Sequence, residues 1–147
     1  MAGTKSSAVR IGIMSFSDGR KRVHDTLRPS IEQHQETLAK VLEQAGVAPV
    51  IADEIAWTPR LAVAGAKQLV AADVAAVVFN IPVFAFPNLA GLAATVLRKP
   101  VAIVSPGEAN LPGMGGLLAA GGALRQMGIT EERIWGPYDS DASRRRL

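Results

Sequence analysis

The chain has 147 residues and no cysteine, 48% of its residues are hydrophobic, and its net charge is +3. This composition predicts one domain around a single hydrophobic core, and it excludes a disulfide, a thiolate nucleophile and a zinc knuckle. Scattered basic residues argue against a nucleic-acid partner, and the lack of a signal peptide or of an apolar run of roughly 20 residues predicts a cytoplasmic protein with no membrane partner.

Short apolar runs alternate with helical patterns along the chain, and they predict five strands with helices between them. Residues 1–8 are small and polar, and we expect them to be disordered. Pro29 suits the first turn of the first helix, and Gly46 suits its end. The predicted strands are residues 9–14, 47–51, 74–79, 101–104 and 133–135. The predicted helices are residues 29–45, 61–72, 89–97 and 117–127.

Strands that alternate with helices require right-handed crossovers and therefore a parallel sheet. We predict an α/β fold, a three-layer doubly wound parallel five-stranded sheet in the flavodoxin-like order 2-1-3-4-5. Residues 9–138 would form this single domain. Residues 139–147 end in three arginines and a leucine, which is typical of either a solvated basic tail or the first turn of a further helix.

Loops beyond the carboxyl ends of parallel strands carry the ligand site in folds of this kind. Residues 105–116 form the first candidate loop, because Ser105, Glu108 and Asn110 are polar and the backbone amides near its glycines could face an anion or hydroxyl at a helix start. A flexible turn whose glycines only let the helix pack close to the sheet is an equal alternative.

The loop at residues 15–22 is the second candidate, because it also follows a predicted strand. Asp18 and Gly19 indicate a turn. The Arg20 guanidinium presents donors in a fixed fork that could hold the hydroxyls or phosphate of a ligand. A solvent-exposed turn arginine is the alternative.

Known catalytic motifs are missing from the sequence. It contains neither a complete dinucleotide fingerprint nor a phosphate loop, and Ser105 is followed by Pro106 and Gly107, which does not fit a nucleophile elbow. His24 and His34 are predicted to be surface residues rather than metal ligands. Nucleotide binding and hydrolysis are therefore disfavoured.

Four carboxylates and a tryptophan follow predicted strand ends. Two of the carboxylates could share a metal or act as acid and base, but nothing in the sequence pairs any two of them. These carboxylates are Asp18, Asp53, Glu54 and Glu108. Trp57 could stack on a sugar or seal a subunit contact, and helix-to-sheet packing is the alternative.

Two segments carry a family resemblance. The first strand leads into Asp18, Gly19 and Arg20, and a second motif begins at Lys99 and ends at Gly128. The second motif comprises Lys99, Pro100, Val101, Pro112, Gly113, Gly116, Leu117, Leu118, Ala119, Ala120, Gly122, Ala123, Leu124, Arg125 and Gly128. Together they resemble the amino-terminal domain of the L-fucose isomerase and L-arabinose isomerase family, over about residues 9–147.

The resemblance implies an aldose–ketose isomerase that moves a proton between adjacent sugar carbons through an enediol. It also implies a divalent metal, commonly Mn2+, held by two carboxylates and a histidine in later domains. We therefore expect this chain to bind no cofactor or metal and to hold no catalytic residue. The partners expected are a sugar substrate and either a homo-oligomer or companion catalytic domains.

In this family the amino-terminal domain supplies oligomer contacts and a loop that reaches a neighbouring subunit's site. By motif, Arg20 carries over as a substrate contact. The candidate substrate-binding residues are Arg20, Asp18, Gly19, Trp57, Asn80 and Glu108.

Two other functions remain open at this point. One is a stand-alone flavodoxin-like module that binds a small ligand without catalysis. The other is a pure assembly scaffold, which exposed apolar surface around Trp57, Phe84 and Phe86 would suit.

Overall fold

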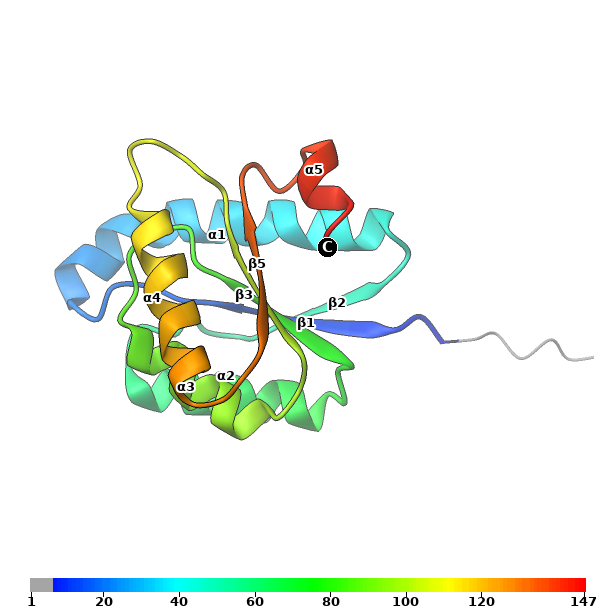
Figure 1. Cartoon of the computed structure of the whole chain (residues 1–147), viewed down its shortest axis with the longest axis horizontal. Coiled ribbons are helices and arrows are strands. Elements are labelled where there is room, and N and C mark those ends of the chain that lie inside the picture. Colours follow the sequence, from blue (N-terminus) through cyan, green and yellow to red (C-terminus); the bar gives the residue numbers. More distant parts are fainter. Residues whose placement is uncertain (1–6) are drawn as a thin grey trace, which may run out of the picture.

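A computed structural model describes residues 7–147 and contains one parallel five-stranded sheet with helices on both faces (Figure 1). The strands run in the order β2-β1-β3-β4-β5, which confirms the predicted α/β fold and its flavodoxin-like order. They are β1 (Arg10–Ser15), β2 (Ala48–Ile51), β3 (Ala76–Asn80), β4 (Val101–Ser105) and β5 (Glu131–Trp135). The disorder predicted for residues 1–8 falls mostly on residues 1–6, which lie outside the described residues.

The helices divide between the two faces of the sheet. They are α1 (Lys21–Gln44), α2 (Pro59–Ala71), α3 (Pro87–Leu97), α4 (Gly113–Gln126) and α5 (Asp141–Arg144). Helices α1 and α5 cover one face, and α2, α3 and α4 pack on the other (Figure 1). Within residues 7–147, no helix combines the length and apolarity needed to cross a membrane.

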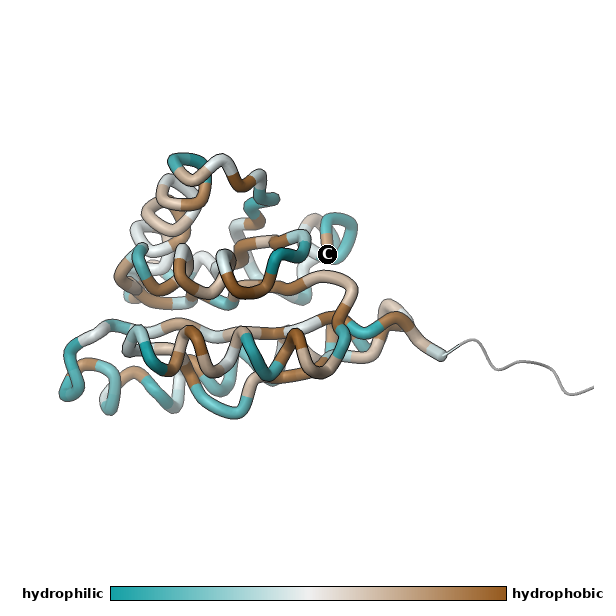
Figure 2. The backbone as a smooth tube through the Cα atoms, turned by 90° about the horizontal axis from the view of Figure 1, so that it is seen from below, coloured by the Kyte–Doolittle hydropathy of each residue, from teal (hydrophilic) through white to brown (hydrophobic). Residues whose placement is uncertain are grey.

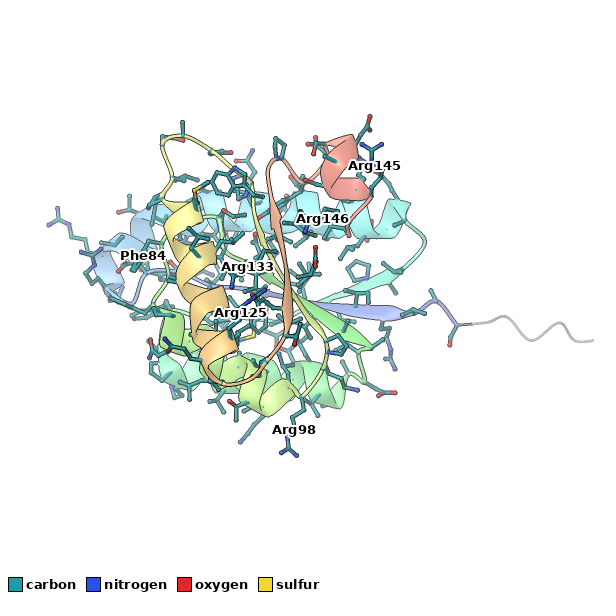
Figure 3. The ribbon with its side chains drawn as sticks, viewed as in Figure 1. Phe84, Arg98, Arg125, Arg133, Arg145 and Arg146 are labelled. Atoms are coloured by element: carbon teal, nitrogen blue, oxygen red, sulfur yellow. The ribbon has the colours of Figure 1, made fainter. Side chains whose placement is uncertain are left out.

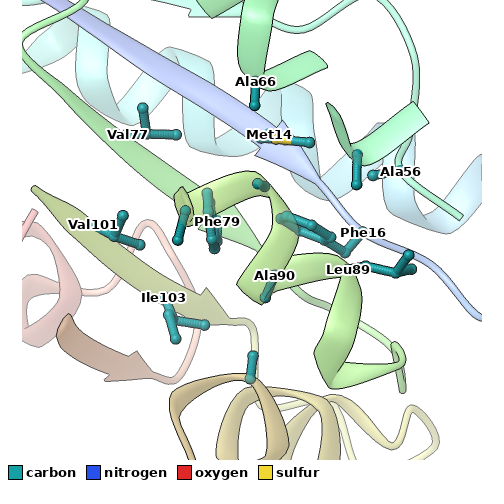
Figure 4. Close-up of a cluster of buried hydrophobic side chains, with 14 of the residues drawn as sticks. Met14, Phe16, Ala56, Ala66, Val77, Phe79, Leu89, Ala90, Val101 and Ile103 are labelled. Atoms are coloured by element: carbon teal, nitrogen blue, oxygen red, sulfur yellow. The ribbon is translucent and has the colours of Figure 1, made fainter. Parts of the chain in front are cut away.

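The larger core lies between the sheet and helices α2, α3 and α4 (Figure 4). Phe16 and Phe79 meet there with ring centroids 4.8 Å apart. A smaller core on the α1 side contains Ile13, Leu38 and Tyr138, with Leu147 packed against it. Because strand residues alternate between the faces, each central strand contributes apolar side chains to both cores.

Helix α1 begins at Lys21, so the predicted start at Pro29 is wrong. Pairs at i,i+4 spacing stabilise the additional turns, since Lys21 pairs with Asp25 and Arg28 with Glu32. Pro29 therefore lies inside the helix, where it lacks one backbone hydrogen bond. The loop after β1 shortens as a result, and Arg20 becomes the N-cap residue of α1.

The other boundaries differ from the prediction by at most four residues, and two of these differences have a clear structural cause. Helix α4 begins at Gly113 rather than residue 117, because the early glycines pack against the loop after β3. Strand β5 begins at Glu131 rather than residue 133, because Glu131 pairs with Val101 in the register of β4.

Polar side chains at the carboxyl ends of the strands are aligned by the sheet register. Ser15 is paired with Asn80 across β1 and β3, and Ser105 is paired with Trp135 across β4 and β5. The loops that follow these strands therefore share one edge of the sheet, where ligands bind in open parallel sheets.

Candidate functional site

The turn between β1 and α1 holds an arginine against a buried carboxylate. Asp18 accepts hydrogen bonds from three Arg20 donors: the backbone N–H at 2.9 Å, Nε at 2.8 Å and Nη2 at 2.6 Å. The Asp18 side chain is 3% exposed, whereas the Arg20 side chain is 70% exposed. The carboxylate thus fixes the orientation of the guanidinium, and the remaining N–H donors of Arg20 stay accessible to a ligand.

This ion pair also sets the charge of the turn. The side-chain hydrogen bonds from Arg20 hold the pKa of Asp18 below its usual range, against the opposing effect of burial. Asp18 is therefore ionised at neutral pH. A fixed Asp–Arg fork of this kind can offer hydrogen bonds to sugar hydroxyls without first becoming ordered.

Aromatic side chains from two other loops border the same turn. A Cβ atom on Gly19 would lie 2.7 Å from the Phe86 ring and 3.6 Å from the Trp57 carbonyl oxygen. A larger residue at this position would displace the Phe86 ring, so glycine favours this close approach of the loops after β1, β2 and β3. Phe86 is partly exposed beside Gly19, so the turn has an aromatic ring against Gly19 and an exposed cation at the next residue, Arg20.

His24 is buried beneath Trp57, so its predicted surface position is wrong. The two rings stack with centroids 5.0 Å apart and an interplanar angle of 11°. The early start of α1 places His24 in its first turns, against the loop that carries Trp57. Trp57 therefore packs against α1, and within the described residues the Nδ1 atom of His24 has no hydrogen-bond partner.

Asn80 is committed to a buried network rather than to an open pocket. Its Nδ2 donates to Ser15 Oγ at 2.9 Å, and its Oδ1 accepts from the Tyr138 hydroxyl at 2.6 Å. Ser15 Oγ in turn donates to Gln35 Oε1 at 2.7 Å. These bonds tie β1, β3, α1 and the segment after β5 together at the sheet edge, and burial raises the pKa of Tyr138 well above its usual value.

Glu108 lies apart from Arg20. It contacts His34 Nε2 at 3.0 Å, beside a pocket of about 190 Å³ between α1 and the loops after β4 and β5. His34 is therefore partly buried and paired rather than a free surface residue. His34 follows Arg20 by about four helical turns, which is roughly 20 Å along α1. The structure thus brings Asp18, Gly19 and Arg20 together with the Trp57 backbone, commits the Asn80 side chain to a buried network and places Glu108 beside His34.

The glycines that start α4 serve close packing. A Cβ on Gly113 would overlap the Ser105 hydroxyl and lie 2.6 Å from the Pro82 carbonyl oxygen. Ser105 is fully buried, and its Oγ has no partner among the described residues. This geometry favours the alternative that these glycines let the helix pack close to the sheet.

The carboxylates at this edge do not form a metal site. Asp18 binds Arg20, Asp53 accepts from Gln68 Nε2 at 2.9 Å, and Glu108 contacts His34. Among residues 7–147, no group of three histidine, aspartate or glutamate side chains could hold a metal ion. The side chains described here therefore do not fit the Mn2+ ion that the family resemblance implies.

We expect the stability of the fold to decrease as the pH falls from 7 to 5, because of His24. Burial lowers the pKa of His24 from its usual value of 6.5, and nearby Arg28 and Lys21 act in the same direction against Asp25. The unfolded chain therefore takes up a proton on His24 at a higher pH than the folded chain does. The contribution of neutral His24 to the free energy of unfolding is complete above pH 6.5, and it is lost as the pH falls below that value, by up to about 1.4 kcal/mol per pH unit. Urea unfolding at several pH values measures this slope.

His24→Phe provides the matched comparison, because it keeps an aromatic ring against Trp57 and has no titrating group. Its free energy of unfolding should vary less over this pH range. If the unmodified chain and His24→Phe lost stability equally between pH 7 and 5, His24 would not be the cause of the pH dependence.

These features define a flavodoxin-like α/β domain whose carboxyl edge carries an exposed arginine fixed by a buried carboxylate. Residues 8–146 match the family model of the L-fucose isomerase first N-terminal domain. The chain belongs to this family.

Two solved structures resemble the chain loosely. A two-component response regulator from Clostridium difficile aligns with a TM-score of 0.45 and 14% identity, over 90% of this chain and 85% of that chain. A protein described as a carboxylesterase from Lactobacillus plantarum WCFS1 aligns with a TM-score of 0.38 and 10% identity, over 95% of this chain and 81% of that chain. A comparison with curated proteins found no match.

Proposed function

We propose that this chain is the sugar-contacting domain of a metal-dependent aldose–ketose isomerase of the L-fucose isomerase type. The observation that carries the proposal is the Asp18–Arg20 pair, exposed at the carboxyl edge of β1 in a chain of this family. Isomerisation of an aldose to a ketose moves a proton between adjacent carbons and leaves the atom count unchanged. The metal, commonly Mn2+, and the groups that move the proton would come from other domains.

The chemistry assigned to this chain is binding and orientation. Arg20 donates hydrogen bonds to sugar hydroxyls, and Asp18 holds the guanidinium in place while it does so. Phe86 offers an apolar ring against Gly19 of the same turn, which suits the C–H face of a sugar. In this role the domain contributes substrate contacts and oligomer contacts to a site completed by a homo-oligomer or by companion catalytic domains.

We expect substitution of Arg20 to weaken the binding of L-fucose by about tenfold or more, because charge-assisted hydrogen bonds are lost. Arg20→Lys retains a cation beside Asp18 but removes the fork, and Arg20→Ala removes both. Saturation-transfer NMR of L-fucose with the 147-residue chain measures the affinity, and circular dichroism checks the fold.

Arg22→Ala is the matched control, since Arg22 is exposed at the start of the same helix. It should bind L-fucose as the unmodified chain does. Equal affinities for the unmodified chain and both Arg20 variants would show that Arg20 does not contact the sugar.

A further inference from the structure

Strand β5 forms one of the two edges of the sheet. In the order β2-β1-β3-β4-β5, its one neighbour is β4. Figure 1 shows β5 running in front of the other strands, between α4 and α5. The unpaired backbone groups of an edge strand are a template on which a further strand can add. This edge is therefore a candidate binding surface.

The register of the sheet shows which backbone groups of β5 face outward. The Gly136 N–H donates to the Ser105 carbonyl oxygen at 3.0 Å, and Arg133 lies opposite Ile103. In a parallel ladder the N–H and C=O of one residue point the same way, and this direction alternates along the strand. The backbone groups of Arg133 and Trp135 therefore point away from β4 and are available to another chain.

The opposite edge of the sheet, β2, is protected against strand addition. The Ala48 N–H donates to the Val9 carbonyl oxygen at 2.8 Å. By the same alternation, the backbone of Pro49 faces away from β1. Proline has no N–H, and a proline at an outward position blunts an edge strand. Strand β5 contains no proline, so its outward N–H donors are intact.

A buried carboxylate holds two arginines beside the β5 edge. Glu131 Oε1 accepts from Arg133 Nε at 2.6 Å and from Arg125 Nε at 3.2 Å. The Glu131 side chain is fully buried, whereas the side chains of Arg133 and Arg125 are 28% and 68% exposed. Because each arginine uses Nε for this contact, its terminal Nη groups can donate to a further anion.

Helix α4 accommodates these arginines at the edge. A Cβ on Gly121 would overlap the Arg133 guanidinium, so a glycine in the middle of the helix makes room for this side chain. Arg125 is the one charged residue of α4, and Figure 2 shows the helix as white, tan and brown until its teal C-terminal end. Figure 3 shows Arg125 and Arg133 between α4 and β5. The cations on this side of the sheet therefore gather at β5.

These charges favour an acidic strand as the occupant of the edge. A second copy that paired through its own β5 would bring Arg125 and Arg133 near their counterparts, and like charges opposite each other are destabilising. An acidic strand instead places carboxylates beside both guanidiniums, where the hydrogen bonds are charge-assisted. Trp135 is 42% exposed and lies two residues after Arg133, on the same face of the sheet. The segment that fits therefore has an acidic residue near Arg133 and an apolar one near Trp135.

We propose that the β5 edge binds an extended acidic segment of a partner protein, which adds to the sheet as a further strand. Backbone hydrogen bonds to Arg133 and Trp135 supply affinity, and contact of the segment's carboxylates with Arg125 and Arg133 supplies selectivity. This inference goes beyond the proposed function, because none of these residues belongs to the sugar contact at Arg20.

Fluorescence polarisation of a labelled peptide with the 147-residue chain tests the proposal. The peptide repeats glutamate, threonine, valine and threonine over about ten residues, so its acidic and apolar side chains share one face. Arg133→Gln should weaken binding by about tenfold, because charge-assisted hydrogen bonds are lost. Arg125→Gln should weaken it by about threefold, since Arg125 is more exposed. Circular dichroism checks that both variants fold.

Arg60→Gln is the matched control, because Arg60 is an exposed arginine on α2, away from β5. It should bind the peptide as the unmodified chain does. A peptide with lysine in place of glutamate should bind at least about tenfold more weakly. N-methylation of the peptide backbone should abolish binding, because strand pairing needs its N–H groups. Equal binding of the N-methylated peptide, or no binding of the glutamate peptide, overturns the proposal.

Amide hydrogen exchange of the chain locates the bound peptide. In the free chain the N–H groups of Arg133 and Trp135 should exchange faster than that of Ile134, which faces β4. A saturating amount of the glutamate peptide should slow exchange at Arg133 and Trp135 by about tenfold or more. Unchanged exchange at these two amides, or binding that Arg133→Gln leaves intact, contradicts the proposed site.

Discussion

Replacing Gly116 by alanine should destabilise the fold by about 2 kcal/mol, whereas replacing Gly122 in the same helix should stabilise it by about 0.5–1 kcal/mol. A Cβ on Gly116 would lie 2.6 Å from the Val83 carbonyl oxygen and 2.7 Å from Ile81 Cγ2. The carbonyl belongs to the backbone and cannot move cheaply. Overpacking of about 3 kcal/mol therefore outweighs the gain of about 1 kcal/mol in helix propensity.

Gly122 provides the opposite case, because its Cβ would meet no atom within 4 Å among the described residues. Only the gain in helix propensity remains there. Urea unfolding in dilute solution measures both variants, with the slope m expected to stay unchanged. A neutral or stabilising effect of Gly116→Ala would show that α4 does not pack this closely on the loop after β3.

Replacing Asn80 by alanine should cost about 3 kcal/mol, because a buried network loses its central member. Ser15 Oγ loses the donor at 2.9 Å, and the Tyr138 hydroxyl loses the acceptor at 2.6 Å. The Val104 carbonyl oxygen, 3.4 Å from the Tyr138 hydroxyl, is only a weak substitute. The remaining cost arises from the cavity that the missing amide leaves.

Tyr138→Phe removes the hydroxyl alone and should cost about 1–2 kcal/mol. The double variant should be less destabilised than the sum of the two single variants, because both remove the same hydrogen bond. Urea unfolding of the four proteins completes the cycle. Strict additivity, or a loss below about 1 kcal/mol for Asn80→Ala, would contradict a network centred on Asn80.

The sheet was predictable from local patterns. Five short apolar runs alternate with helical segments, and the rules for parallel crossovers then leave few strand orders. The start of α1 was not predictable in the same way, because Pro29 is a strong signal for a first turn and the ion pairs of the preceding turns are weak signals. Tertiary packing of His24 against Trp57 also contributes there, and no local pattern reports it.

In the candidate site, too, contacts between neighbouring residues were predictable from the sequence and contacts between distant residues were not. The turn at Asp18 and Gly19 followed by Arg20 was recognisable because adjacent residues make it. The network of Ser15, Asn80 and Tyr138 joins residues that are far apart in sequence, 65 positions in one bond and 58 in the other. The sequence alone therefore does not point to Tyr138, and it predicts a ligand contact for Asn80, whose side chain makes internal hydrogen bonds in the structure.

An amide NMR map of the 147-residue chain with L-fucose is the most direct test of the sugar contact. We expect the amide signals of residues 17–20 and of Phe86 to shift as the sugar is added, and to stay in place in Arg20→Lys. Shifts confined to the pocket beside His34 and Glu108, or no shifts at any sugar concentration that preserves the fold, would contradict the proposed role of the turn after β1.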